Sequence, residues 1–400
     1  MRSRDRQKYM KLKEKIKRTF IDLIKINEVY PHEDKIIKYV LNRFRTLNIP
    51  TKLDSFKNVI AYFPGKGEPI LLNTHLDIPE SVDNLDYEID GDVIRGTGKS
   101  ILGADPKSGL AVLLELTGYL KNNNIMTRPI EFVFTRGEEA GLFGALNLDY
   151  RLLKSKMGLV IDEDGPCTSI VTKAPAYYRI DGMIEGKTVH PRDWKDGLNA
   201  LQFTAQTIGQ LQQGEIADGV TFNIGIFTSG TARNSVPGRV EFQSELRSFN
   251  EKKLLREAKK VERCLKSLEK KDLRVHLDTA LEFHSYSLEK NHELFLRLER
   301  TYGQLNLSSN YYETYGGSDA NVINAHDIRV VPVGSAYYRA HQYTEYVHLE
   351  EMKDLLFFLA EFVKRDPSTS LGMTYRLRDD AFIVLLLGLR LLFPLHLLSE

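Results

Sequence analysis

Short apolar runs alternate with helical patterns through the first half of the chain. Residues 59–63, 70–72, 130–134 and 159–161 are dominated by apolar side chains, which predicts buried strands, and residues 110–120 predict the helix between the second and third of them. Strands buried on both faces and separated by helices are typical of an α/β fold. The pattern therefore predicts a mixed, mostly parallel sheet covered by helices on both faces.

The pattern changes after residues 173–175. A strand, a helix, two alternating strands and a charged helix are predicted next, at residues 177–185, 198–211, 221–227, 240–247 and 251–269. Two helices on a small antiparallel sheet are typical of an α+β domain. Helices and a buried strand at residues 328–333 then return. We therefore expect a discontinuous α/β domain, residues 1–174 and 285–365, interrupted by an inserted α+β domain, residues 175–284.

The N-terminal segment is strongly basic. Residues 1–18 hold nine basic and two acidic residues, and apolar residues recur at helical spacing from Leu12 to Ile24. A basic arm can bind nucleic acid, but a charge run is usually the solvated face of a helix. We therefore expect an amphipathic helix here and no nucleic-acid partner.

The C-terminal segment has a different character from the rest. Residues 381–398 are the most apolar stretch of the chain, yet Arg390 and Pro394 interrupt it. A charged residue near the centre of a bilayer is costly, which argues against a membrane span. The composition shifts abruptly at Asp366, so we expect residues 366–400 to be an atypical apolar tail outside the fold.

Composition narrows the class of protein further. The chain has 400 residues, 42% hydrophobic and 27% charged, which excludes a disordered, collagen-like or disulfide-scaffold protein. Its 55 basic and 54 acidic residues leave a net charge of +1, so no global field favours nucleic acid or an anionic membrane. The two cysteines, Cys167 and Cys264, match no zinc or redox spacing. A reducing, cytoplasmic location is expected.

Side chains that can bind metal or move protons follow the predicted strands. They are His75 and Asp77, Asp105, Glu138 with Glu139, Asp162, and His341. Ligands in open α/β sheets collect at the carboxyl ends of the strands. Each alone has an ordinary explanation: a surface pair, a glycine-bounded turn, or acids at the start of a helix. Together they form an ordered set of nitrogen and oxygen ligands suited to a pair of Zn or Mn ions.

These residues lie in a series of motifs that resembles a known family. The series reads HLD, LGADPKSG, TRGEEAGLFGA, VIDEDGP, TVHPRDWKDGLNA, GTARNSVPGRVEF, GGSDAN and H-x-x-x-E. It looks like the dinuclear-zinc metallopeptidase family of peptidase T, carboxypeptidase G and aminoacylase, and is most similar to the peptidase T-like branch. The resemblance covers roughly residues 15–365. It implies a catalytic domain with two metals and a lid or dimerisation domain inserted after the strand of Asp162.

The resemblance also implies a ligand set. His75 and Asp162 would hold one metal, Glu139 and His341 the other, and Asp105 would bridge the two. Asp164 is an alternative to Asp162, because the segment has one residue more than some relatives. The metals would be two divalent ions, most simply Zn, with Mn or Co as alternatives.

Further roles come from the same resemblance. Asp77 would orient the metal-binding histidine two residues before it, and Glu138 would be the general base. In the inserted domain, His190 would stabilise the oxyanion, often in a partner's site, which implies a homodimer through that domain. Asn234 and Arg247 would contact the substrate carboxylate or its surroundings, although Arg247 could also simply pair with a neighbouring glutamate.

The chain departs from the family at three positions. Pro106 stands where a second aspartate is frequent, Gly137 replaces an aspartate before the glutamate pair, and Ile78 replaces a small residue. None of these removes a ligand. Family members have a cis peptide after the bridging aspartate, and Pro106 lowers the cost of a cis bond from about 3 kcal/mol to under about 1 kcal/mol.

The resulting hypothesis is a metal-dependent aminopeptidase that hydrolyses short peptides. One alternative is an amidohydrolase of the same fold that acts on N-acyl amino acids or dipeptides. Another is a non-catalytic binding protein on this scaffold, against which the intact Glu138 and ligand set argue.

Overall fold

The computed structural model describes residues 3–82 and 84–365. The predicted tail, residues 366–400, lies outside this range. Among the described residues, no helix is both long and apolar enough to cross a membrane.

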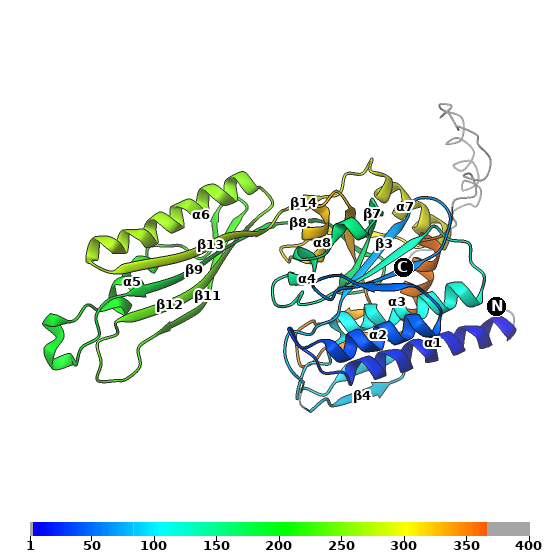
Figure 1. Cartoon of the computed structure of the whole chain (residues 1–400), viewed down its shortest axis with the longest axis horizontal. Helices are drawn as coiled ribbons and strands as arrows, with labels where there is room; N and C mark the ends of the chain where they lie inside the picture. The colour runs from blue at the N-terminus through cyan, green and yellow to red at the C-terminus, as the bar shows by residue number, and fades with distance from the viewer. Residues whose placement is uncertain (1–2, 83, 366–400) are drawn as a thin grey trace, which may run out of the picture. The chain divides into compact units, whose positions relative to one another are not determined.

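A mixed nine-stranded sheet forms the centre of the larger domain (Figure 1). Its strands are β1 (Thr51–Leu53), β2 (Val59–Phe63), β6 (Ile130–Thr135), β3 (Ile70–His75), β7 (Met157–Glu163), β16 (Arg329–Gly334), β8 (Ser169–Ala174) and β14 (Tyr286–Ser287), with β15 (Asn310–Glu313) beside β8. The central strands β6, β3, β7 and β16 are parallel, whereas β1, β2 and β14 are antiparallel to their neighbours. The predicted mixed, mostly parallel sheet is confirmed.

Seven helices of the described residues pack on or beside this sheet. They are α1 (Ser3–Ile24), α2 (Asp34–Thr46), α3 (Ala104–Asn122), α4 (Phe143–Leu146), α7 (Glu293–Leu305), α8 (Asp319–Asn324) and α9 (Leu349–Phe362). Helix α3 contacts β3, β7, α1 and α9. Helices α4 and α8 contact each other, α4 also contacts β6, and α8 also contacts β16. The apolar residues of α1, including Leu12, Phe20 and Ile24, are buried, which confirms the predicted amphipathic helix.

A second, small sheet has no counterpart among the predicted elements. It consists of β4 (Tyr87–Asp90), β5 (Val93–Gly96), β17 (Tyr337–Tyr338) and β18 (Tyr346–His348). It joins the segment before α3 to the segment after β16, and Gly96 donates its backbone N–H to the carbonyl of Glu345 at 2.9 Å. This sheet therefore connects the segment that leads into Asp105 at the start of α3 with the segment that carries His341.

The inserted domain has its own antiparallel sheet and core. Its strands are β10 (Gly214–Ala217), β11 (Val220–Ser229), β12 (Arg239–Ser248), β9 (Ala176–Glu185) and β13 (Arg274–Phe283), and its longer helices are α5 (Ala200–Ile208) and α6 (Glu251–Lys266). Leu254, Ala258 and Val261 of α6 are buried in that core. This confirms the predicted α+β architecture, although β13 was not predicted. The exact domain boundaries stay a prediction.

Candidate dinuclear metal centre

Parallel strands bring the predicted ligands to one edge of the sheet. His75 is the last residue of β3, Asp162 lies near the end of β7, and Glu139 follows β6. Because β3, β6 and β7 are parallel, their carboxyl ends share one edge. Asp105 and His341 lie at the same edge, so five side chains that are up to 266 positions apart in the sequence come together.

His75 is the centre of the first group. Its side chain is 1% exposed, with Nε2 at 3.0 Å from Asp105 Oδ1 and 3.2 Å from Asp162 Oδ1. Its Nδ1 lies 3.4 Å from Asp77 Oδ1 on the other side. Burial lowers the pKa of His75, but the charge of Asp162 and contacts with all three carboxylates raise it well above the ordinary value. The imidazole is thus held between two carboxylates on one side and an orienting carboxylate on the other.

His341 is the centre of the second group. Its Nε2 lies 2.9 Å from Glu139 Oε1 and 3.4 Å from Asp105 Oδ2. Contacts with Asp105 and then Glu139 raise the pKa of His341 to about 10. The residue has φ of +62°, a left-handed conformation that is uncommon for a non-glycine residue and that clusters at functional sites. The His341 side chain is 51% exposed, so this half opens to solvent.

Asp105 stands between the two groups. Its Oδ1 faces His75 and its Oδ2 faces His341, which is the arrangement that a bridging ligand needs. The peptide between Asp105 and Pro106 is cis, as expected from the resemblance, and Asp105 departs from helical geometry with ψ of 116° inside α3. Burial raises the pKa of Asp105, but hydrogen bonds from His341 and His75 outweigh it and hold the pKa below the ordinary value.

The glutamate pair does not begin a helix, contrary to the sequence interpretation. Glu138 and Glu139 lie in a loop, and α4 begins only at Phe143. Their backbone N–H groups donate to Asp77, at 3.0 Å from Glu138 to Oδ1 and 3.2 Å from Glu139 to Oδ2. The positive φ of Gly137, +59°, turns the chain out of β6 into this loop. Asp77 therefore supports both His75 and the glutamate pair.

The structure separates Asp162 from its alternative, Asp164. Of the two, it is Asp162 whose carboxylate contacts His75, with Oδ1 at 3.2 Å from Nε2. The carboxyl of Asp164 instead interacts with the backbone of Arg339 and Ala340, in the turn before His341. This geometry favours Asp162 as the ligand. Asp164 instead stabilises the turn before His341.

The side chains fit a pair of divalent cations. The imidazoles of His75 and His341 contact the carboxylates of Asp105, Asp162 and Glu139, and Glu138 lies beside Glu139 at the hollow. Burial raises the pKa of Glu138 well above its ordinary value and also raises those of Glu139 and Asp162, because negative charge here is poorly solvated. Ligand atoms of His75, Asp105 and Glu139 lie within 4.8 Å of one another. Nitrogen and oxygen donors crowded in this way suit Zn or Mn.

A hollow of about 740 Å³ opens beside the glutamate pair. Its lining includes Glu138 and Glu139 from the larger domain and Tyr177, Arg179, Arg247, Glu282 and Phe283 from the inserted domain. Arg247 pairs with Glu245 at 2.9 Å and donates to the backbone carbonyl of Tyr315 at 2.7 Å. The predicted substrate contact Arg247 is therefore at the hollow, and its pairing with a neighbouring glutamate is also present.

Two predicted residues are not brought to this hollow. His190 and Asn234 are exposed and are absent from its lining. His190 Nδ1 accepts a hydrogen bond from the backbone N–H of Arg192 at the start of the 3-10 helix η2 (Pro191–Asp196), and Trp194 in that turn is 64% exposed. Within one chain, neither residue lines the hollow beside the glutamate pair.

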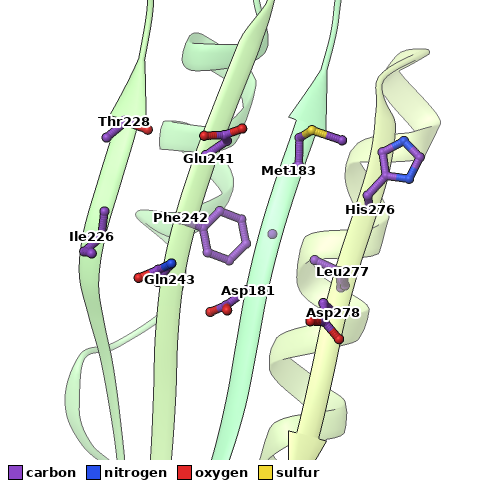
Figure 2. A pocket seen from close by; sticks show the side chains of 11 residues that line it. Asp181, Met183, Ile226, Thr228, Glu241, Phe242, Gln243, His276, Leu277 and Asp278 are labelled. Atoms are coloured by element: carbon purple, nitrogen blue, oxygen red, sulfur yellow. The ribbon is translucent and has the colours of Figure 1, made fainter. Parts of the chain in front are cut away.

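A second hollow lies on the open face of the inserted sheet. Figure 2 shows side chains of four neighbouring strands around it, among them Ile226, Glu241, Met183 and His276. Its volume is about 500 Å³, and none of the predicted site residues lines it.

Two residues in the sequence motifs have structural partners that the spacing did not reveal. Glu345, the glutamate of H-x-x-x-E, is 1% exposed and accepts backbone N–H groups of Leu102, Gly103 and Asp105 at 2.7–2.9 Å. Asp319, in GGSDAN, accepts the hydroxyl of Thr135 at the end of β6. Both residues lie in motifs that the sequence analysis quoted, but it gave neither residue a role.

Comparison with known proteins agrees with this architecture. The model of a peptidase dimerisation domain matches residues 172–273, and that of peptidase family M28 matches residues 58–169. The uncharacterized protein YqjE of Bacillus subtilis is 28% identical over 346 residues, which cover 83% of this chain and 93% of that protein.

Two solved structures are similar over nearly their whole length. The aminopeptidase PepT from Bacillus cereus has a TM-score of 0.76 at 27% identity, and a tripeptidase from Staphylococcus aureus has a TM-score of 0.80 at 26% identity. Each comparison covers 88% of this chain and 98% of the other. The fold and these relatives support a peptidase, a hydrolase of peptide bonds. The resemblance to the family of peptidase T, and to its peptidase T-like branch, is confirmed.

Proposed function

We propose that this chain is a metal-dependent aminopeptidase that hydrolyses short peptides. The observation that carries the proposal is Asp105, whose two oxygens face two separate histidine–carboxylate groups beside the hollow. A hollow of about 740 Å³ is of the size of small-molecule sites and would take a short peptide rather than a folded chain.

His75 and Asp162 would hold one divalent cation, Glu139 and His341 the other, and Asp105 would contribute one oxygen to each. Zinc is the simplest choice for this donor set, with manganese or cobalt as alternatives. When bound, the cations would supply positive charge that polarises the scissile carbonyl and favours ionisation of the attacking water.

Glu138 would move the proton. Its backbone is fixed by Asp77, while its side chain lines the hollow and is not needed as a ligand. A general base works best when its pKa lies near the operating pH, and burial raises the pKa of Glu138 in that direction. Glu138 would accept the proton of the attacking water and then return it to the leaving amine.

The inserted domain would bind the rest of the substrate. Arg247 at the hollow, together with Asn234, would contact the substrate carboxylate or its surroundings. His190 would stabilise the oxyanion, and because it does not line the hollow of its own chain, it would act in a partner's site. The match to a peptidase dimerisation domain supports a homodimer. A cytoplasmic location stays a prediction.

Replacing Glu138 tests the proposed mechanism. Glu138→Gln should lower kcat by about 10²–10⁴, alter KM far less and leave both cations bound, because Glu139 is the ligand. If Glu138 only shapes the loop, turnover should change little. Near wild-type turnover with both cations present would reject the mechanism.

A substrate screen separates the peptidase from the amidohydrolase hypothesis. Di- and tripeptides would be compared with N-acyl amino acids, with zinc, manganese and cobalt supplied separately. Peptides with a free amino terminus should be the best substrates. A clear preference for N-acyl amino acids would establish the alternative, and no hydrolysis of either class with any of these metals would favour a binding protein.

A further inference from the structure

The loop that carries the proposed base is fixed at four consecutive backbone amides. The N–H of Arg136 donates to Asn58 Oδ1 at 3.1 Å and that of Gly137 to Glu33 Oε1 at 3.1 Å. The next two donate to Asp77, as described above. Side chains from three separate segments therefore determine where the loop leaves β6.

Glu33 is the least expected of these partners. It lies at the start of α2, more than 100 residues before the loop, and its side chain is fully buried. Its second oxygen, Oε2, accepts Nη2 of Arg136 at 2.6 Å. A single buried carboxylate thus binds both the backbone of Gly137 and the side chain of the residue before it.

Arg136 is buried between residues 30–33 and Phe56. Nη1 donates to the carbonyl of Phe56 at 3.0 Å and Nη2 to that of Pro31 at 2.8 Å. The guanidinium also lies 5.7 Å from the ring centroids of Tyr30 and Phe56. A buried charge is tolerated only with its partner, so Arg136 and Glu33 depend on each other.

Gly137 completes the arrangement. With φ of +59°, a Cβ on this residue would lie 2.5 Å from Cδ2 of Tyr30, so the Tyr30 ring occupies the space of a side chain. In the family that the sequence resembles, an aspartate is frequent at this position. The contact between Tyr30 and Gly137, together with Glu33, holds the residue immediately before the proposed base.

We propose that Glu33 is a positioning residue that orients Glu138 through the Gly137 amide and the Arg136 side chain. It does not touch the reacting atoms. The inference rests on the proposed function, because it assigns Glu33 an effect on the base. Its loss should misplace Glu138 without removing any metal ligand.

The first test compares two buried glutamates. In Glu33→Gln, kcat should fall by about 10- to 100-fold, with KM changed by less than about threefold and metal content unaltered. The matched control is Glu131→Gln: Glu131 is 3% exposed, lies at the other end of β6 and accepts the backbone N–H groups of Lys154 and Ser155. That variant should lose thermal stability but keep kcat when assayed well below its midpoint.

The second test asks whether Glu33 acts through Glu138. In the Glu138→Gln background, where residual turnover is measured over long incubations, adding Glu33→Gln should lower kcat by less than about twofold. Equal, additive losses in both backgrounds would overturn the inference. If Glu138→Gln alone keeps turnover with metals bound, the proposed function fails instead, and the two failures are thereby distinguished.

A third variant keeps the test valid if Glu33→Gln does not fold. Gly137→Ala leaves Glu33 and Arg136 intact but forces the loop away from the Tyr30 ring. It should also lower kcat at constant metal content. Wild-type kcat in a folded Gly137→Ala protein would show that the position of this loop does not control turnover, and the proposal would be wrong.

Discussion

Asp77 has two tasks in the structure, and the substitution Asp77→Asn interferes with both. The carboxylate is fully buried, lies 3.4 Å from His75 Nδ1 and accepts the backbone N–H groups of Glu138 and Glu139. An asparagine keeps the shape and one acceptor oxygen but presents an NH₂ group in place of the other. One of the two loop amides would then face a donor.

The size of the effect can be worked out from these contacts. A hydrogen bond to a charged acceptor contributes about 1.5–3 kcal/mol, and a buried amide left without an acceptor costs about 1–3 kcal/mol. Because these two costs overlap for a single amide, we expect Asp77→Asn to lower the free energy of unfolding by about 2–4 kcal/mol. Loss of the carboxylate that orients a metal-binding histidine typically lowers metal affinity or activity by about 10- to 100-fold.

Two measurements check this expectation. Urea unfolding of the metal-free protein measures the loss of stability that comes from the loop amides. Zinc titration of the folded protein measures the loss of metal affinity that comes from the orientation of His75. Glu131→Gln serves again as the control, with a loss of stability but unchanged zinc affinity. If Asp77→Asn matched the wild type in both measurements, the dual role of Asp77 would have to be abandoned.

The remaining predictions follow from the same geometry. Asp105→Ala should lose both cations by elemental analysis, because it removes an oxygen from each group; full metal content and activity would exclude a bridge. His190→Ala should lower kcat without changing metal content, and mixing it with Glu138→Gln subunits should restore activity if His190 acts across a dimer; no recovery in verified mixed dimers would confine it to its own chain. Deletion of residues 366–400 should leave peptide hydrolysis intact and improve solubility, whereas loss of soluble enzyme would show that the tail is needed.

The sequence predicted the strands that position the ligands because these strands are buried on both faces. An apolar run such as residues 70–72 is distinctive, and the polar residues directly after it are easily found. The motifs then placed His75, Asp105 and His341 in order, and the structure brings them together. The proximity of the five ligands was therefore predictable, while their role as ligands stays a prediction.

Contacts between distant segments were not predictable in the same way. Glu33 precedes Arg136 by more than 100 residues. A helical or strand repeat relates only residues close in sequence, so no such repeat could indicate this contact. The strand β13 mixes charged and apolar residues, and its residues are exposed or half-buried, so its apolar pattern is weak. The loop of the glutamate pair was mistaken for a helix start because acidic residues are also favoured there.

The exposed turn after His190 contains a tryptophan whose fluorescence can be measured. Trp194 is the single tryptophan of the chain and is 64% exposed. Excitation at the red edge of protein absorbance would therefore report on this one turn, four residues from His190, without labelling. The emission maximum of an indole shifts to the blue when it leaves water. Fluorescence of the unmodified protein thus reports directly whether substrate or a second subunit covers the turn.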